Sequence, residues 1–164
     1  MKYNVCHNEL EIKNKSGVYC FYPFEHLDNK NKGVFKVGRT SQDLAKRIEN
    51  YHSYFPMGVY IVFFLQYPRV KRGQNKEELH KEIEKELIEN LKNEGGKMLI
   101  FPSRPSQKSE WFYCSFSQLR KAFLKTQTDN GGVLNEYSLS SLNSSYKKNL
   151  KNNDKFIGEI IYKV

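Results

Sequence analysis

Cysteine is scarce in this chain, and its arrangement excludes two kinds of covalent framework. The 164 residues contain three cysteines, Cys6, Cys20 and Cys114, and no CxxC pair. An odd number without paired spacing argues against a disulfide scaffold and favours a reducing, intracellular compartment. A structural zinc site is not expected either, because Cys6 and His7 have no second pair of ligands at zinc-site spacing.

Long apolar runs are also missing. No stretch approaches the roughly 18–20 apolar residues of a membrane-spanning helix. Residues 1–10 lack the apolar run and the small-residue cleavage site of a secretory signal. The sequence also contains no strongly amphipathic basic helix of the kind that binds a membrane surface. We therefore expect an intracellular protein, in the cytoplasm or the nucleus, with no membrane partner.

Acidic residues are outnumbered by basic ones. The chain has 18 Asp and Glu against 27 Lys and Arg, which gives a formal net charge of +9. Such a surplus predicts a polyanionic partner, and nucleic acid is the most common one. The alternative is that a Lys- and Asn-rich sequence reflects the base composition of its genome, in which case the charge has no specific partner.

The chain is long enough for one domain with a real core, plus a tail. Runs of β-branched and aromatic residues at 17–24, 33–37 and 59–67 predict three strands, the first two of them as an antiparallel hairpin. The third run is almost continuously apolar and is expected to be central. The fold class predicted is α+β: a small antiparallel or mixed sheet of about three core strands, flanked by helices.

Helical periodicity appears in three places. A first helix is expected to open at Thr40, with Asp43 at the spacing of a capping box. A second is expected from about residue 76 to 91, and a third from about 118 to 125 after a short strand at 111–114. The compact domain is therefore predicted to span residues 1–125. Residues 126–164 are rich in Asn, Ser and Lys and are predicted to be loosely attached, with a possible terminal strand at 156–164.

Several polar residues stand where an apolar helix face is expected. His80 falls near the middle of the apolar stripe of the second helix, and Glu84 lies on its edge, whereas Glu82 points away. A carboxylate turned toward a sheet is costly unless it is paired or binds a metal. On the first helix, Arg47 and His52 border the stripe, and a guanidinium there suits a phosphate. The alternatives are a surface salt bridge for Arg47, a Glu84 that extends to solvent and a His80 hydrogen-bonded in the core.

Five short motifs follow one another in a fixed order along the chain. They are GVY at 17–19, KVGRT at 36–40, Arg47, IEKELI at 83–88 and EWF at 110–112. This ordered set resembles the GIY-YIG nuclease superfamily, in particular the phage- and large-virus-type branch with KVG and EWF elements. The resemblance covers about residues 17–114. A single motif such as GVY is a weak signal, and the ordered set is much more specific.

The resemblance implies an endonuclease that hydrolyses phosphodiester bonds, expected in double-stranded DNA, with one Mg²⁺ or Mn²⁺. Tyr19 matches the tyrosine thought to help deprotonate the attacking water, Arg47 the arginine that stabilises charge on the scissile phosphate, and Glu84 the metal ligand. A carboxylate suits Mg²⁺, which keeps most of its waters. A free phenol has a pKa near ~10, so Tyr19 needs Arg47, Lys36 or Arg39 nearby to act as a base.

The sequence also departs from the family pattern. The first residue of the YIG motif is Lys36 instead of tyrosine. Lys36 could act as a base or contact a phosphate, or its presence could weaken the site. Either Tyr51 or His52 could supply a second polar group after the arginine. Glu110 could join the site, although we favour the interpretation that its segment anchors a strand through Trp111.

These considerations give two sets of candidate residues. The catalytic candidates are Tyr19, Lys36, Arg39, Arg47, His52 and Glu84, with Glu84 as the metal ligand. The cations expected to follow the phosphate backbone are Arg39, Arg47, Arg69, Lys71 and Arg72. A second hypothesis is a nucleic-acid-binding module on the same fold that has lost turnover through Lys36. A third is a basic adaptor for proteins or anionic lipids.

Overall fold

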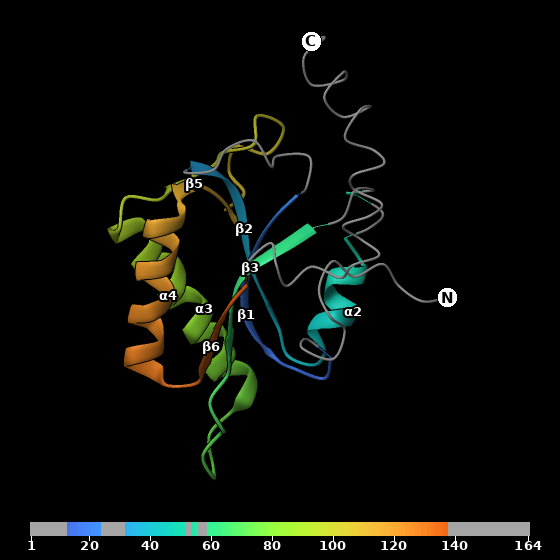
Figure 1. The fold of residues 1–164 in the computed structure, drawn as a ribbon, viewed down its shortest axis with the longest axis vertical. Coiled ribbons are helices and arrows are strands. Elements are labelled where there is room, and N and C mark those ends of the chain that lie inside the picture. The colour runs from blue at the N-terminus through green and yellow to red at the C-terminus, as the bar shows by residue number, and fades with distance from the viewer. Residues whose placement is uncertain (1–12, 24–31, 52–53, 56–58, 138–164) are drawn as a thin grey trace.

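One antiparallel sheet organises residues 13–23, 32–51, 54–55 and 59–137, which are the part of the chain that the computed structural model describes (Figure 1). The sheet has six strands in the order β4-β5-β2-β1-β3-β6, and every neighbouring pair is antiparallel. The strands are β1 (Gly17–Pro23), β2 (Lys32–Thr40), β3 (Val59–Gln66), β4 (Lys97–Met98), β5 (Trp111–Ser115) and β6 (Val133–Glu136).

The prediction of about three core strands is therefore wrong, although the α+β class holds. The hairpin of β1 and β2 is present, and β3 is an interior strand, as its apolar sequence indicates. The sequence does not reveal β4 and β6, because their two and four residues are too short to show strand alternation. Both form where the edges of β5 and β3 offer backbone hydrogen-bonding partners.

Three helices cover the sheet in the described part of the chain. They are α2 (Leu44–Glu49), α3 (Lys76–Asn93) and α4 (Phe116–Asn130). The first helix begins later than predicted, because Thr40 still belongs to β2 and the helix cap is Asp43, whose carboxylate accepts from the Ala45 backbone N–H at 2.9 Å. The helix α3 begins at Lys76 as expected, behind an Asn75 cap. None of these helices has the length and apolar character needed to cross a membrane.

The helices lie on opposite faces of the sheet (Figure 1). On one face, α3 and α4 bury a large apolar core that includes Ile83, Leu87 and Phe123. On the other face, the short α2 packs Leu44 and Ile48 against a second, mainly aromatic cluster. This second cluster includes Tyr19. The Tyr19 phenol therefore lies on the α2 face of the sheet, opposite the face that α3 and α4 cover.

The last helix extends beyond residue 125, into the segment whose composition predicts loose attachment. Thr126 is fully buried, and its hydroxyl accepts a hydrogen bond from Asn90 Nδ2 of α3 at 3.0 Å. The helix ends at Gly131, where φ is +79°, and the chain continues into β6. Residues 138–164, including the terminal strand predicted at 156–164, lie outside the described residues.

We predict that Thr126→Val lowers the free energy of unfolding by about 1–3 kcal/mol, because Asn90 is buried and would lose its hydrogen-bonding partner. Thr128→Val is the matched control. Each hydroxyl donates to the carbonyl four residues earlier at 2.9 Å, but Thr128 is exposed. Urea denaturation of both variants measures the difference. Equal effects would show that the Asn90–Thr126 contact does not hold α4 on α3.

Candidate active site

The site is organised by an open stretch of β2. The strand pairs with β5 only over Lys32–Lys36, which face Ser115–Trp111. Its last residues keep β1 on one side, where Gly17 faces Thr40, but have no strand partner on the other side in the described part of the chain. We call residues 38–40 the open edge of β2. Side chains from both faces of the sheet can meet around it.

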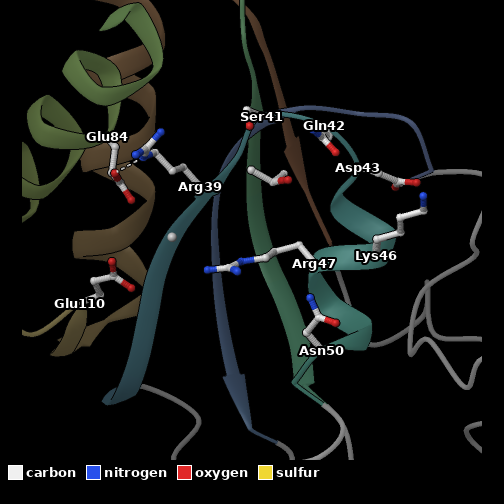
Figure 2. A pocket seen from close by; sticks show the side chains of 11 residues that line it. Arg39, Ser41, Gln42, Asp43, Lys46, Arg47, Asn50, Glu84 and Glu110 are labelled. Atoms are coloured by element: carbon white, nitrogen blue, oxygen red, sulfur yellow. Dashed lines mark ion pairs between the residues drawn. The ribbon is translucent and has the colours of Figure 1, made fainter. Parts of the chain in front are cut away.

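A cavity of about 450 Å³ surrounds this open edge. In Figure 2, Arg47 extends from α2 toward β2, while Arg39, Glu84 and Glu110 lie on the other side of the strand. Strand alternation explains the division, since Gly38 faces the same side as α2 and Arg39 faces the side of α3. The lining consists of Gly38, Arg39, Thr40, Ser41, Gln42, Asp43, Lys46, Arg47, Asn50, Glu84 and Glu110. We call this the first cavity.

Glu84 is the inward carboxylate of α3, as helical spacing predicts. Its side chain is 17% exposed, and its Oε2 lies 2.7 Å from Nε of Arg39. Burial raises the pKa of Glu84, the Arg39 charge works in the opposite direction, and the nearby Glu110 carboxylate raises it further. The net effect is a raised pKa for Glu84. The guanidinium of Arg39 therefore does not fully compensate for the cost of burying this carboxylate.

Tyr19 lies deeper, beneath Arg47. Its ring is fully buried, its hydroxyl is 3.1 Å from the Tyr51 hydroxyl, and it accepts a hydrogen bond from Arg47 Nε at 3.3 Å. Burial raises the pKa of Tyr19 well above that of a free phenol, Tyr51 adds to the increase, and Arg47 lowers it only in part. In this arrangement Tyr19 is a neutral phenol at neutral pH that orients Arg47.

Gly38 allows the Tyr19 ring to lie flat against the sheet. The two residues are partners in the β1–β2 register. A Cβ atom at Gly38 would lie 2.7 Å from both Cζ and the hydroxyl of Tyr19, which is closer than real Cβ atoms approach. The glycine of the KVG motif is therefore required by close packing, and it links β2 to the tyrosine of the GVY motif.

The Lys36 side chain forms an ion pair with Glu110. Its ammonium also lies 5.9 Å from the centroid of the Trp111 ring. Trp111 in turn packs edge-on against Phe21 in the aromatic core, at 6.0 Å between centroids. The EWF segment thus does two things: Trp111 anchors β5, as expected, and Glu110 lines the first cavity.

His80 is a core residue. It is 1% exposed, and its ring stacks on that of Tyr67 at 3.5 Å between centroids. Its Nδ1 has no hydrogen-bonding partner in the described structure. Burial lowers the pKa of His80. His80 does not line the first cavity, so its burial supports the alternative of a core residue, but the hydrogen bond expected for it is absent at Nδ1 among the described residues.

Other expected residues are not brought to the first cavity. Arg69, Lys71 and Arg72 are exposed in the connection from β3 to α3 and do not line it. His52 lies outside the described residues. Conversely, the lining contains two residues that were not expected at the site, Asp43 and Asn50. They lie four residues before and three residues after Arg47. That helical spacing, which places side chains on one face, is the signal that could have identified them.

Two carboxylates of the first cavity, Glu84 and Glu110, are the side chains that could hold a divalent cation. No group of three or more potential metal-ligating side chains occurs among the described residues. Mg²⁺ is commonly held by one or two carboxylates and several waters, and Glu84 and Glu110 are two mutually repelling carboxylates on one wall. The charged lining residues balance, three against three: Arg39, Lys46 and Arg47 against Asp43, Glu84 and Glu110. A divalent cation would give the cavity the positive charge that a phosphodiester requires.

Comparison with known proteins defines the class. The family model described as the T5orf172 domain matches residues 17–127, and the chain belongs to this family. The domain is found in phage and nuclease-like proteins, and membership is compatible with a nuclease-like or nucleic-acid-binding role. No match was found among curated proteins or solved structures.

We predict that Gly38→Ala lowers the free energy of unfolding by about 1–3 kcal/mol, because the buried Tyr19 ring cannot move aside. Gly33→Ala, in the same strand, is the control. A Cβ there meets the Phe35 ring at an ordinary 3.5 Å, and both variants reduce the flexibility of the unfolded chain equally. Thermal or urea denaturation tests the pair. A Gly38→Ala protein as stable as Gly33→Ala would contradict the packing described for Tyr19.

Proposed function

We propose that this protein is a divalent-metal-dependent endonuclease that hydrolyses phosphodiester bonds in DNA. One observation carries the proposal: one cavity is lined by both Arg47 and Glu84, which come from different helices on opposite faces of the sheet. Beneath Arg47, the Tyr19 hydroxyl accepts a hydrogen bond from the Nε of that arginine. These are the three site residues that the resemblance to the GIY-YIG nucleases implies. The net positive charge of the chain supports a nucleic acid as the substrate.

Arg47 is suited to binding the scissile phosphate. A guanidinium has five N–H donors in a fixed plane, and in Arg47 the Nε donor is committed to Tyr19. The two Nη groups remain for phosphate oxygens, and Figure 2 shows the side chain directed toward β2. In this proposal Tyr19 is a positioning residue that fixes the guanidinium, because its raised pKa disfavours a role as base in this arrangement.

Glu84 is the proposed metal ligand, and Glu110 stands close enough to influence its charge. A bound Mg²⁺ would neutralise charge that develops on the phosphate and the leaving oxygen. Arg39 is paired with the Glu84 carboxylate in the structure. In the proposed reaction Arg39 leaves this carboxylate and turns to the phosphate backbone.

Lys36 fits a phosphate contact better than a base. Its side-chain nitrogen forms an ion pair with Glu110 and lies near the ring of Trp111. An ammonium can donate to a phosphate but has no lone pair with which to accept a proton. The presence of Lys36 in place of the family's tyrosine therefore need not abolish turnover.

A second candidate function is a DNA-binding module without turnover. The observation in its favour is the Arg39–Glu84 ion pair, in which the proposed metal ligand already has a cationic partner at 2.7 Å. The two candidates predict opposite results in one assay. Incubation with supercoiled plasmid and Mg²⁺ or Mn²⁺ should yield nicked or linear DNA if the protein is a nuclease, and EDTA should prevent it. Binding without any cleavage under these conditions would support the module.

In the same assay, Glu84→Gln should reduce cleavage at least about 100-fold, the range expected when an electrostatic contact to the transition state is lost. DNA binding in EDTA should remain unchanged or become slightly tighter, because an anion facing the phosphates has been removed. Glu82→Gln is the control, since Glu82 is exposed on the same helix. Equal losses in both variants would indicate a general effect on α3, and full activity of Glu84→Gln would exclude the proposed metal ligand.

Lys36 gives an independent prediction. If it contacts a phosphate, Lys36→Arg should retain most of the cleavage rate at saturating DNA, and Lys36→Met should mainly raise KM. Loss of turnover in both variants, together with loss of an ionisation from the pH–rate profile, would instead identify Lys36 as the base.

A further inference from the structure

A second cavity lies between α3, Met98 of β4 and the segment that precedes β5. Its volume is about 330 Å³. It shares Glu84 and Glu110 with the first cavity, so these two carboxylates form a wall common to both. The rest of its lining comes from α3, Met98 and the segment before β5: Lys81, Lys85, Ile88, Glu89, Lys92, Met98, Lys108 and Ser109.

The charges of the second cavity favour an anionic ligand. Four lysines stand against three glutamates, two of which belong to the shared wall. Lys81 pairs with Glu77 at 3.1 Å, and Lys92 lies 3.8 Å from Glu89. Two lysines of the lining remain available.

The available lysines are Lys85 and Lys108, which form no ion pair with any residue in the described part of the chain. Both line the second cavity together with the two carboxylates of the shared wall. Across the wall, Lys46 is likewise unpaired among the described residues. Unpaired cations therefore flank the two carboxylates on both sides.

We propose that the second cavity binds the DNA backbone on the far side of the cleaved bond, so that the strand crosses the open edge of β2 from the α2 side to the α3 side. This inference rests on the proposed function for its choice of ligand. A nucleic-acid backbone repeats its phosphates at regular intervals, so a strand bound at the first cavity carries phosphates on both sides of the reacting one, and lysines can neutralise them. The central carboxylates accept a phosphate only with a metal, whereas Lys85 and Lys108 bind flanking phosphates without one.

This surface differs from the one that the sequence predicts. Arg69, Lys71 and Arg72 line neither cavity. The sequence does not reveal the second cavity, because Lys108 comes from a segment without regular periodicity and meets Lys85 only through the fold.

Binding in EDTA tests the proposal separately from cleavage. Each phosphate contact contributes about 0.9 to the slope of log affinity against log salt, so Lys85→Ala with Lys108→Ala should reduce the slope for a fluorescein-labelled DNA duplex by roughly 1.8. The control is Lys121→Ala with Lys125→Ala, which removes the same charge from the exposed face of α4. Its slope should fall by less than half as much.

The outcomes separate the two hypotheses. An unchanged slope in the Lys85/Lys108 variant, or one that changes as much as in the control, overturns the second cavity as a backbone site. Tighter binding of duplex RNA than of DNA overturns the choice of ligand. If the slope falls as expected but the wild-type protein never cleaves DNA, the second cavity stands and the nuclease proposal fails.

Discussion

The late start of β5, at Trp111 opposite Lys36, is the constraint on which the site depends. Because β5 pairs with β2 only as far as Lys36, the residues that follow keep a single strand partner in the described structure. An unpaired strand edge ordinarily attracts another chain. Here the edge is short and flanked by charged groups, with Arg47 on one face and the Arg39–Glu84 pair on the other. The gap in the pairing of β2 therefore lets charged side chains from both faces of the sheet line one cavity.

The two cores of the protein explain why these charged groups can be held in place. The larger core fixes α3, and with it Glu84, through buried residues such as Ile83 and Leu87 on the adjacent face of the helix. The aromatic core fixes Tyr19, which in turn holds Arg47. Of the candidate side chains, Arg47 is thus one hydrogen bond from a fully buried residue, and Glu84 lies within one helical turn of two. Precise positioning of this kind is what a site for phosphoryl chemistry requires.

The sequence predicted some of these features because they depend on local periodicity. Helical spacing predicted that Glu84 faces inward. Strand patterns predicted the hairpin in which Tyr19 pairs with Gly38. The six-stranded sheet was not predicted, because β4 and β6 exist through their partners and have too few residues for a pattern. The raised pKa of Tyr19 could not be predicted either, since the burial that causes it depends on how α2 packs over the ring. The contact between Lys36 and Glu110 joins residues 74 positions apart and has no local signal.

Arg39 connects the two candidate functions, because it is paired with Glu84, the carboxylate proposed to hold the metal. A guanidinium brings one charge to a wall that contains two carboxylates, so the partly buried Glu84 keeps a raised pKa even when paired. A phosphate that attracts Arg39 would leave this carboxylate less compensated and increase its affinity for a metal. A metal bound there would in turn release Arg39 to the phosphate. By linkage, DNA increases the affinity for the metal by the same factor as the metal increases the affinity for DNA. Under the proposed function the two ligands therefore strengthen each other's binding. In their absence Glu84 is paired with Arg39.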